Sequence, residues 1–121
     1  MNFEIEEITD EDKLFRHFPK SFIENEKLTV EAFIPQGEDL SVFWEKYCAD
    51  AATCLSLAGK TQLTHGAGHF VTAEVRNHNF IVRHSATSNQ AHASIDGITR
   101  RPRGNFLQMR KILQSIFIVD I

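Results

Sequence analysis

No run of apolar residues in this 121-residue chain approaches the roughly 20 residues that a helix needs to cross a bilayer. The chain also lacks a surplus of basic residues, because 13 Lys and Arg stand against 16 Asp and Glu and leave a formal net charge of −3. Non-specific binding to nucleic acid or anionic membranes requires such a surplus to neutralise phosphates. We therefore expect neither a membrane span nor a general affinity for polyanions.

Cysteine is scarce, with two copies. Cys48 and Cys54 lie in a segment predicted to be helical, at a spacing that puts them on different faces. We expect two buried, reduced side chains, with neither a disulfide nor a thiolate metal site. The first residues are acidic and have neither the basic nor the apolar region of a signal peptide. These features predict a cytoplasmic protein.

Proline and tyrosine are also rare, whereas phenylalanine occurs ten times. Apolar residues make up 42% of the chain and charged residues 24%, which is ordinary for a globular domain. The length is sufficient to bury a core without metal or disulfide support. No linker-like or repetitive segment interrupts the chain, so we expect a single domain over residues 1–121, with a core rich in Phe rings.

Hydrophobic periodicity predicts four elements in the first half. Residues 10–18 fit a short helix that ends at Pro19. Residues 28–34 alternate as a half-buried strand does, and residues 40–44 repeat this pattern briefly. The apolar positions of residues 44–55 fall on one stripe of a helix, for which Gly59 supplies the C-terminal stop.

The second half is predicted to be richer in strands. Residues 69–75 and 80–84 fit a β-hairpin across Asn77-His78, and residues 91–95 fit a further strand. Asn105 and Gln108 resemble a capping box for a final helix. Residues 116–119 fit either a buried strand or a continuation of that helix. The pattern predicts an α+β fold in which a small, mostly antiparallel sheet packs against two or three helices as one pair of layers.

Histidine is concentrated in one stretch. In the predicted hairpin, His69 and His84 point to the same face, and His92 approaches from the next strand. Converging imidazoles are suited to a metal ion or to acid–base catalysis near neutral pH. The spacing matches no established metal motif, so we expect neither a metal nor another cofactor, and hydrogen-bonded structural histidines remain an alternative. The stretch contains five of the six histidines, at positions 65, 69, 78, 84 and 92.

Two other motifs in this stretch are weak. The segment His65-Gly66-Ala67-Gly68 lacks the third glycine of a dinucleotide fingerprint and the Gly-Lys-Ser/Thr of a phosphate loop. Ser85, Thr87 and Ser88 follow His84, which suggests a hydroxyl nucleophile beside a base. No Gly-x-Ser-x-Gly elbow supports that suggestion.

Four short segments resemble a family of small bacterial proteins that has no assigned activity. They are residues 14–19, 28–33, 40–42 and 89–93, and the likeness covers roughly residues 14–97. Members of that family tend to carry proline where Gln90 stands, and an Arg-Gly pair near Phe43-Trp44. The resemblance implies a compact α+β unit from a bacterium, with Arg16, His17 and His92 at an important surface.

Three functions are consistent with the sequence. Because no complete catalytic set can be assembled, we favour a partner-binding or accessory module, or a homo-oligomer, which uses residues 15–22 and the basic residues Arg100, Arg101 and Arg103. The first alternative is a small hydrolase or nuclease-like enzyme that acts on an anionic substrate through His17, His84 and His92, with Arg16 or Arg83 to bind the anion. The second alternative is a nucleic-acid-binding module that uses Arg100, Arg101, Arg103, Arg110 and Lys111.

Overall fold

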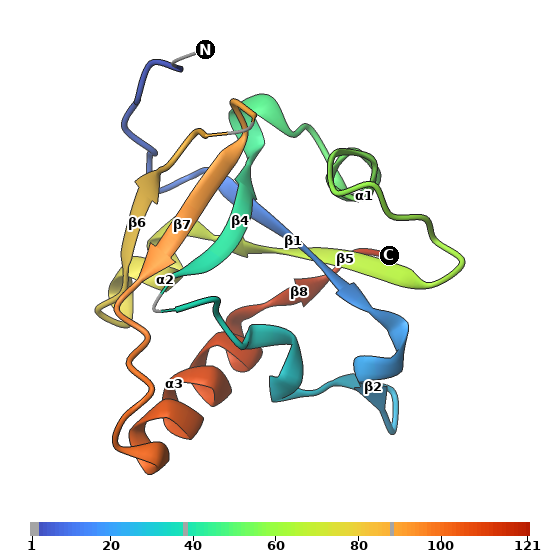
Figure 1. The fold of residues 1–121 in the computed structure, drawn as a ribbon, viewed down its shortest axis with the longest axis vertical. Helices are drawn as coiled ribbons and strands as arrows, with labels where there is room; N and C mark the ends of the chain where they lie inside the picture. The colour runs from blue at the N-terminus through green and yellow to red at the C-terminus, as the bar shows by residue number, and fades with distance from the viewer. Residues whose placement is uncertain (1–2, 38, 88) are drawn as a thin grey trace.

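The computed structural model describes residues 3–37, 39–87 and 89–121. They form an α+β fold built on a six-stranded open sheet, and every neighbouring pair of strands is antiparallel (Figure 1). The predicted fold class is confirmed. Across the sheet the strands are β6 (Ile81–His84), β7 (His92–Asp96), β4 (Leu40–Trp44), β1 (Lys13–Pro19), β5 (His65–Val71) and β8 (Ile118–Val119).

The other elements surround this sheet. A two-stranded hairpin, β2 (Ile23–Glu24) and β3 (Lys27–Leu28), turns at Asn25 and Glu26, which both have positive φ. The three α-helices are α1 (Ala51–Leu57), α2 (Thr72–Asn77) and α3 (Arg103–Ile116). The three short 3₁₀ turns are η1 (Lys20–Phe22), η2 (Val30–Phe33) and η3 (Glu45–Tyr47). No helix in the described part of the chain is long and apolar enough to cross a membrane.

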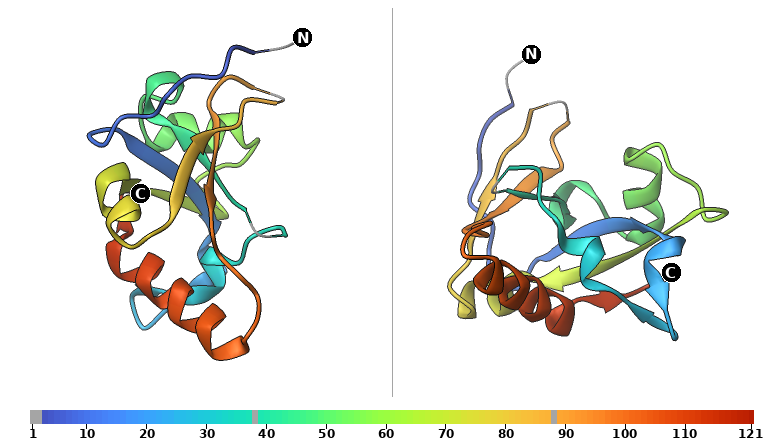
Figure 2. Two further views of the ribbon diagram at one scale, coloured as in Figure 1. Left: turned by 90° about the vertical axis from the view of Figure 1, so that its left-hand side faces the viewer. Right: turned by 60° about the horizontal axis from the view of Figure 1, so that its bottom comes forward.

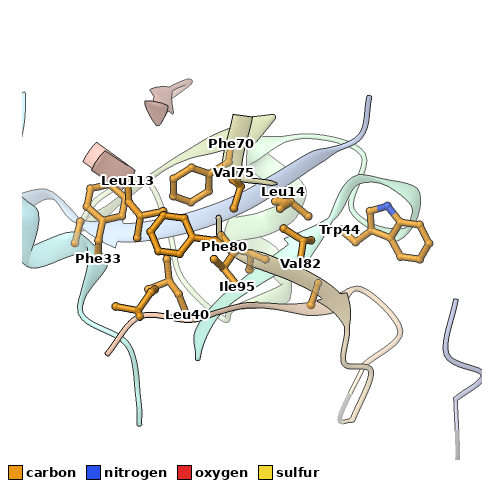
Figure 3. Packing of buried hydrophobic residues seen from close by; sticks show 14 of the residues in the cluster. Leu14, Phe33, Leu40, Trp44, Phe70, Val75, Phe80, Val82, Ile95 and Leu113 are labelled. Atoms are coloured by element: carbon orange, nitrogen blue, oxygen red, sulfur yellow. The ribbon is translucent and has the colours of Figure 1, made fainter. Parts of the chain in front are cut away.

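Hydrophobic clusters cover both faces of the sheet. Leu14 and Phe18 of β1 point into the larger cluster, whereas Phe15 points into the smaller one. Helix α3 closes the larger cluster through Leu113, and α1 closes the smaller one through Leu55. The two helices lie on opposite sides of the sheet (Figures 1 and 2). Figure 3 shows the larger cluster, in which Phe33, Phe70 and Phe80 supply much of the bulk.

The predicted helix over residues 10–18 is wrong, because that segment contains the central strand β1. Leu14 and Phe15 are both buried, on opposite faces of the sheet. An adjacent apolar pair followed by Phe18 satisfies a helical stripe, but it equally suits a strand that is covered on both faces. Pairing with β5 runs along the whole strand as far as Pro19.

The predicted strand over residues 28–34 is also largely wrong. Only Lys27 and Leu28 pair, within the small hairpin, and the chain then forms the 3₁₀ turn η2, which buries Ala32 and Phe33. The alternation was consistent with a strand, but no neighbouring strand lies beside this segment to accept its hydrogen bonds. The next prediction, a strand over residues 40–44, is confirmed by β4.

The predicted helix over residues 44–55 begins later than expected. Trp44 belongs to β4, and α1 starts only after Asp50, whose side chain accepts a hydrogen bond from the Thr53 backbone N–H at 2.8 Å. This N-cap fixes the start of the helix. Gly59, at φ +70°, follows its last turn as predicted. The expectation that the two cysteines occupy different faces of one helix is wrong, because Cys48 precedes α1 and packs in the same cluster as Cys54; both thiols are free and buried.

The predicted hairpin over residues 69–84 is wrong. Residues 72–77 form α2, and three strands separate β5 from β6 in the sheet. His69 and His84 therefore do not lie beside each other on one face of a hairpin, as predicted. The strand predicted at residues 91–95 is confirmed within one residue by β7.

The final helix is confirmed, but its cap is not. Helix α3 begins at Arg103 after Pro102, without a side-chain capping bond, so the expected box of Asn105 and Gln108 is not formed. At its other end, α3 stops at Ile116, and β8 pairs with β5. The helix thus ends at Ile116 and a strand follows, but this strand is exposed and not buried as expected.

Glycines in β5 allow close packing. A Cβ on Gly68 would lie 2.1 Å from the backbone oxygen of Ile118 and 2.8 Å from the Phe117 ring, and one on Gly66 would lie 2.7 Å from the Phe18 ring. Such contacts are too short for any side chain. The segment from His65 to His69 is therefore a strand against which neighbouring groups pack tightly, and not a phosphate-binding loop.

Candidate functional site

A cavity of about 440 Å³ lies between the C-terminal half of β1 and the turn η2. Strands β1 and β4 pair only at Leu14↔Trp44 and Phe15↔Phe43 and then separate, while β1 continues along β5. The space opened by this separation is bordered by η2 and by the loop after α1. Its lining is Arg16, His17, Phe18, Pro19, Phe22, Glu31, Ala32, Ile34, Lys60 and His65.

Arg16 spans the gap between the separated strands. Its Nε donates to the Ala32 carbonyl at 2.9 Å, and its Nη1 donates to the Ser41 carbonyl at 2.7 Å. Burial lowers the pKa of this guanidinium to about 10, and it stays charged at neutral pH. Among the described residues, no carboxylate forms an ion pair with it. The cavity thus contains a partly buried positive charge that donates to two backbone carbonyls.

His17 adds a second polar group without a partner. Its Nδ1 is buried, and within the described part of the chain nothing hydrogen-bonds to it. Burial, together with the nearby Arg16, His65 and Lys60, lowers the pKa of His17 to about 4. The imidazole is therefore neutral at pH 7. An unpaired buried nitrogen costs stability, which makes this atom a natural contact for a bound group.

Lys60 and His65 complete the basic side of the cavity. The His65 ring lies 6.0 Å from that of His17, centroid to centroid, and its Nδ1 is 2.8 Å from the Thr64 hydroxyl. Lys60 is exposed and, in the ranges that the structure describes, forms no ion pair. Glu31 is the acidic member of the lining. Two fixed positive charges therefore stand against one negative charge.

The rest of the cavity lining is mostly apolar. Phe18 and Phe22 supply rings, and Pro19 and Ile34 supply aliphatic surface. Phe18 is almost fully buried, so this apolar wall is anchored in the larger cluster. A lining that combines basic and apolar groups is usual for a small-molecule site, where polar groups orient the ligand and apolar groups bury it.

His92 lies on a different part of the same sheet. Its Nδ1 is 2.9 Å from the Ser85 carbonyl and from the Ser85 hydroxyl, and its Nε2 is 3.3 Å from the Ser41 hydroxyl. Ser85 in turn contacts the Ser94 hydroxyl at 2.7 Å. His92 and Arg16 thus contact the same residue, Ser41, one at its side chain and the other at its backbone.

His84 is a structural histidine in this fold. Its Nδ1 accepts a hydrogen bond from the Glu6 backbone N–H at 2.9 Å, and its Nε2 lies 2.8 Å from the Gln90 carbonyl. The ring packs against Trp44 and Tyr47. Both nitrogens are occupied, and His84 does not line the cavity that contains Arg16 and His17. The structure therefore does not bring His84 together with these predicted site residues.

A larger cavity, of about 670 Å³, runs beside the N-terminal arm and includes Arg83 and His84 in its lining. Its two arginines and Glu6 are already paired. Glu6 contacts Lys46, Arg76 contacts Asp10, and Arg83 contacts Asp39 and Asp96. A ligand there would have to displace existing ion pairs, so this cavity is a weaker candidate than the one at Arg16.

The predicted basic surface is partly tied into the fold. Arg100 donates to the Gly37 and Pro35 carbonyls and, like Arg110, lies over the Phe106 ring. The other basic residues of this cluster, Arg101, Arg103 and Lys111, are exposed.

The apolar part of the surface predicted to bind a partner is not available at two positions. Phe15 and Phe18 are 3% and 1% exposed, and they fill the two clusters. Phe22 is half-buried and lines the cavity. The rings in residues 15–22 thus support the core and the cavity more than an open docking surface.

Sequence inspection found Arg16 and His17 but not their neighbours. Lys60 and Glu31 carry no motif. Glu31 and His65 join the site because η2 and β5 flank the end of β1, and Lys60 joins it from the loop between α1 and β5. Ser41 was likewise invisible as a partner of His92. In the described ranges, no cluster of three or more His, Cys, Asp or Glu residues is arranged to hold a metal ion. Ser88 lies outside these ranges.

Comparison with protein-family models, with curated proteins and with solved structures found no match to this chain, so its function is inferred here from the geometry of its own residues.

Proposed function

We propose that this protein binds a small organic anion in the cavity between β1 and η2. The observation that carries this proposal is the unpartnered Nδ1 of His17, next to the unpaired guanidinium of Arg16, in a cavity that can admit a ligand. An anionic head group would accept hydrogen bonds from the basic side. The head group is a carboxylate or a phosphoryl group, since both are recognised by Arg, Lys and imidazole donors.

The apolar wall suggests the second half of the ligand. Phe18, Phe22 and Ile34 offer surface for an aromatic or short aliphatic body. The volume of about 440 Å³ falls within the range of roughly 300–1,000 Å³ that is typical of small-molecule sites. A free inorganic ion would leave this wall without a partner. The preferred ligand is therefore amphiphilic, with one negative end and one apolar end.

Three probes separate these contributions in a binding titration. Phenyl phosphate has both ends, inorganic phosphate has only the anion, and phenol has only the ring. We expect phenyl phosphate to bind most tightly, with chemical-shift changes at His17, His65 and Phe22 by NMR. If all three probes fail to bind at millimolar concentration and low salt, or if they perturb a different surface, the proposal is wrong.

Replacing Lys60 tests the basic side without disturbing the core. Because Lys60 is exposed, we expect Lys60→Ala to weaken binding by only about fivefold. This factor corresponds to the free energy that an exposed ion pair contributes at low salt. Lys111→Ala is the matched control, because this exposed lysine of α3 does not line the cavity. Equal weakening by both variants would indicate a general charge effect and would contradict a defined site.

A further inference from the structure

The polar network on β4 and β7 has the geometry of a nucleophile and its base. Ser41 is exposed, and its hydroxyl lies 3.3 Å from Nε2 of His92. The other ring nitrogen, Nδ1, is 2.9 Å from the Ser85 carbonyl oxygen. The three groups come from β4, from β7 and from the residue that follows β6, so only the folded sheet brings them together.

The Ser85 carbonyl decides which nitrogen of His92 carries the proton. A carbonyl oxygen can only accept a hydrogen bond, whereas the Ser85 hydroxyl, also 2.9 Å from Nδ1, can donate or accept, so a proton on Nδ1 satisfies both contacts. In the neutral ring Nε2 is then unprotonated, and it can only accept, which directs the Ser41 O–H toward it. A base with its free nitrogen at a hydroxyl, and its other nitrogen held by an acceptor, is the arrangement that activates serine in hydrolases.

The ring of His92 is held in place from behind. The Ser85 backbone N–H donates to the His92 carbonyl at 3.1 Å, so the residue that orients the ring is itself attached to His92. The Ser85 hydroxyl adds a second contact to Nδ1 and a contact to Ser94. This support limits rotation of the imidazole and keeps Nε2 aimed at Ser41.

Arg16 supplies positive charge at the same residue. Its Nη1 is 2.7 Å from the Ser41 carbonyl oxygen, and no carboxylate of the described chain neutralises it in an ion pair. This contact is made to the backbone of Ser41, so Arg16 helps to hold in place the strand that carries the hydroxyl.

We propose that Ser41 is a nucleophile and His92 its general base, in a site that cleaves carboxylic esters. His92 Nε2 takes the proton as Ser41 Oγ bonds to the ester carbonyl carbon. The C–O bond to the alcohol then breaks, and the alcohol leaves with that proton. Water next attacks the acyl-serine, giving one proton to His92; the bond to Ser41 Oγ breaks, and the proton returns to it. Atoms and charge balance without any further reactant.

This proposal is independent of the anion cavity, because Ser41 and His92 do not line that cavity. Failure of either experiment therefore leaves the other proposal in place. Ser41 is exposed, so an ester in solution can reach its hydroxyl.

Covalent labelling with a fluorophosphonate tests the nucleophile directly. We expect one adduct per chain, mapped to Ser41 by peptide mass spectrometry. Ser41→Ala removes the adduct, and because this side chain is exposed, the variant should keep its thermal stability. His92→Asn slows labelling by roughly a hundredfold, the lower range for general-base catalysis.

Hydrolysis of p-nitrophenyl acetate supplies a second measurement. We expect Ser41→Ala and His92→Asn to abolish the Ser41-dependent part of the hydrolysis rate. His78→Asn removes one solvent-exposed imidazole and should leave that part of the rate intact. His78 is exposed at the end of α2 and is a matched control. Absence of labelling, an adduct on another serine, or hydrolysis equal in wild type and Ser41→Ala would each overturn the assignment.

Discussion

The indole N–H of Trp44 donates to a carboxylate oxygen of Asp12 across 2.8 Å, and this bond ties β4 to the turn that precedes β1. The same oxygen of Asp12 accepts the Thr9 backbone N–H at 3.3 Å. Burial tends to raise the pKa of Asp12, but the hydrogen bonds from Trp44 and Thr9 outweigh it, so the pKa lies below its ordinary value. The carboxylate is thus stabilised in its charged form.

This bond predicts a specific loss of stability in acid. Because the pKa of Asp12 is lowered by folding, its contribution is complete above the unfolded pKa of roughly 3.9 and disappears as the pH falls through the lower folded value. Denaturant titrations of wild type and Asp12→Asn, followed by Trp44 fluorescence, measure it. The difference in unfolding free energy between the two proteins should shrink with acidification. A difference that does not vary with pH would contradict this prediction.

His17 is predicted to titrate far below an ordinary histidine. Its folded pKa of about 4 lies below an unfolded value near 6.5, so the unfolded chain binds the proton more readily between these values. The contribution of His17 to the free energy of unfolding is therefore complete above about pH 6.5 and is lost as the pH falls toward 4. An NMR titration of the imidazole Hε1 signals measures this pKa, with exposed His78 as the internal reference.

Ligand binding should shift the same titration. A bound phosphoryl group places negative charge beside His17 and favours its protonated form, so phenyl phosphate is expected to raise the pKa of His17. The signal of His78 should not move. An unchanged His17 titration at saturating ligand would mean that the anion binds elsewhere.

Gly68→Ala is predicted to destabilise the fold. The new Cβ would meet the Ile118 backbone oxygen and the Phe117 ring, and overpacking of this kind costs about 1–3 kcal/mol. Gly104→Ala is the matched control, since nothing lies within 4 Å of its Cβ position in α3. There the change should stabilise by roughly 0.5–1 kcal/mol through helix propensity. Urea unfolding of both variants gives the two free energies, which should differ in sign.

His84→Ala is predicted to affect stability and not ligand binding. It removes two hydrogen bonds, to the Glu6 N–H and the Gln90 carbonyl, and leaves buried polar groups without partners, which costs about 1–3 kcal/mol. Thermal unfolding should show this loss, whereas the affinity for phenyl phosphate should remain that of the wild type. Lost affinity in a folded variant would place His84 in the site after all.

Local chemistry in the sequence was sufficient for several elements. Residues 40–44 alternate and form β4, and the stripe from Phe106 to Leu113 forms α3. Gly59 ends α1 at a positive φ that other residues adopt reluctantly. Such features depend on a few neighbouring residues, and so they are visible in one dimension.

Segments whose structure depends on distant partners could not be predicted in this way. Residues 13–19 are a strand because β4 and β5 lie on either side of them, and residues 30–34 are not a strand because no partner is present. The hairpin prediction failed for the same reason. Periodicity reports which positions are apolar, but it does not report which segment supplies the hydrogen bonds.

The α+β class, the strand over residues 40–44 and the final helix could be predicted from the sequence alone. Only the tertiary structure decided that Arg16 and His17 share a cavity with Lys60 and His65, that His92 meets Ser41, and that His84 is a buried support. The physical reason is the order of strands in the sheet. Hydrogen bonds between segments far apart in the chain set which side chains become neighbours, and no local pattern records that choice.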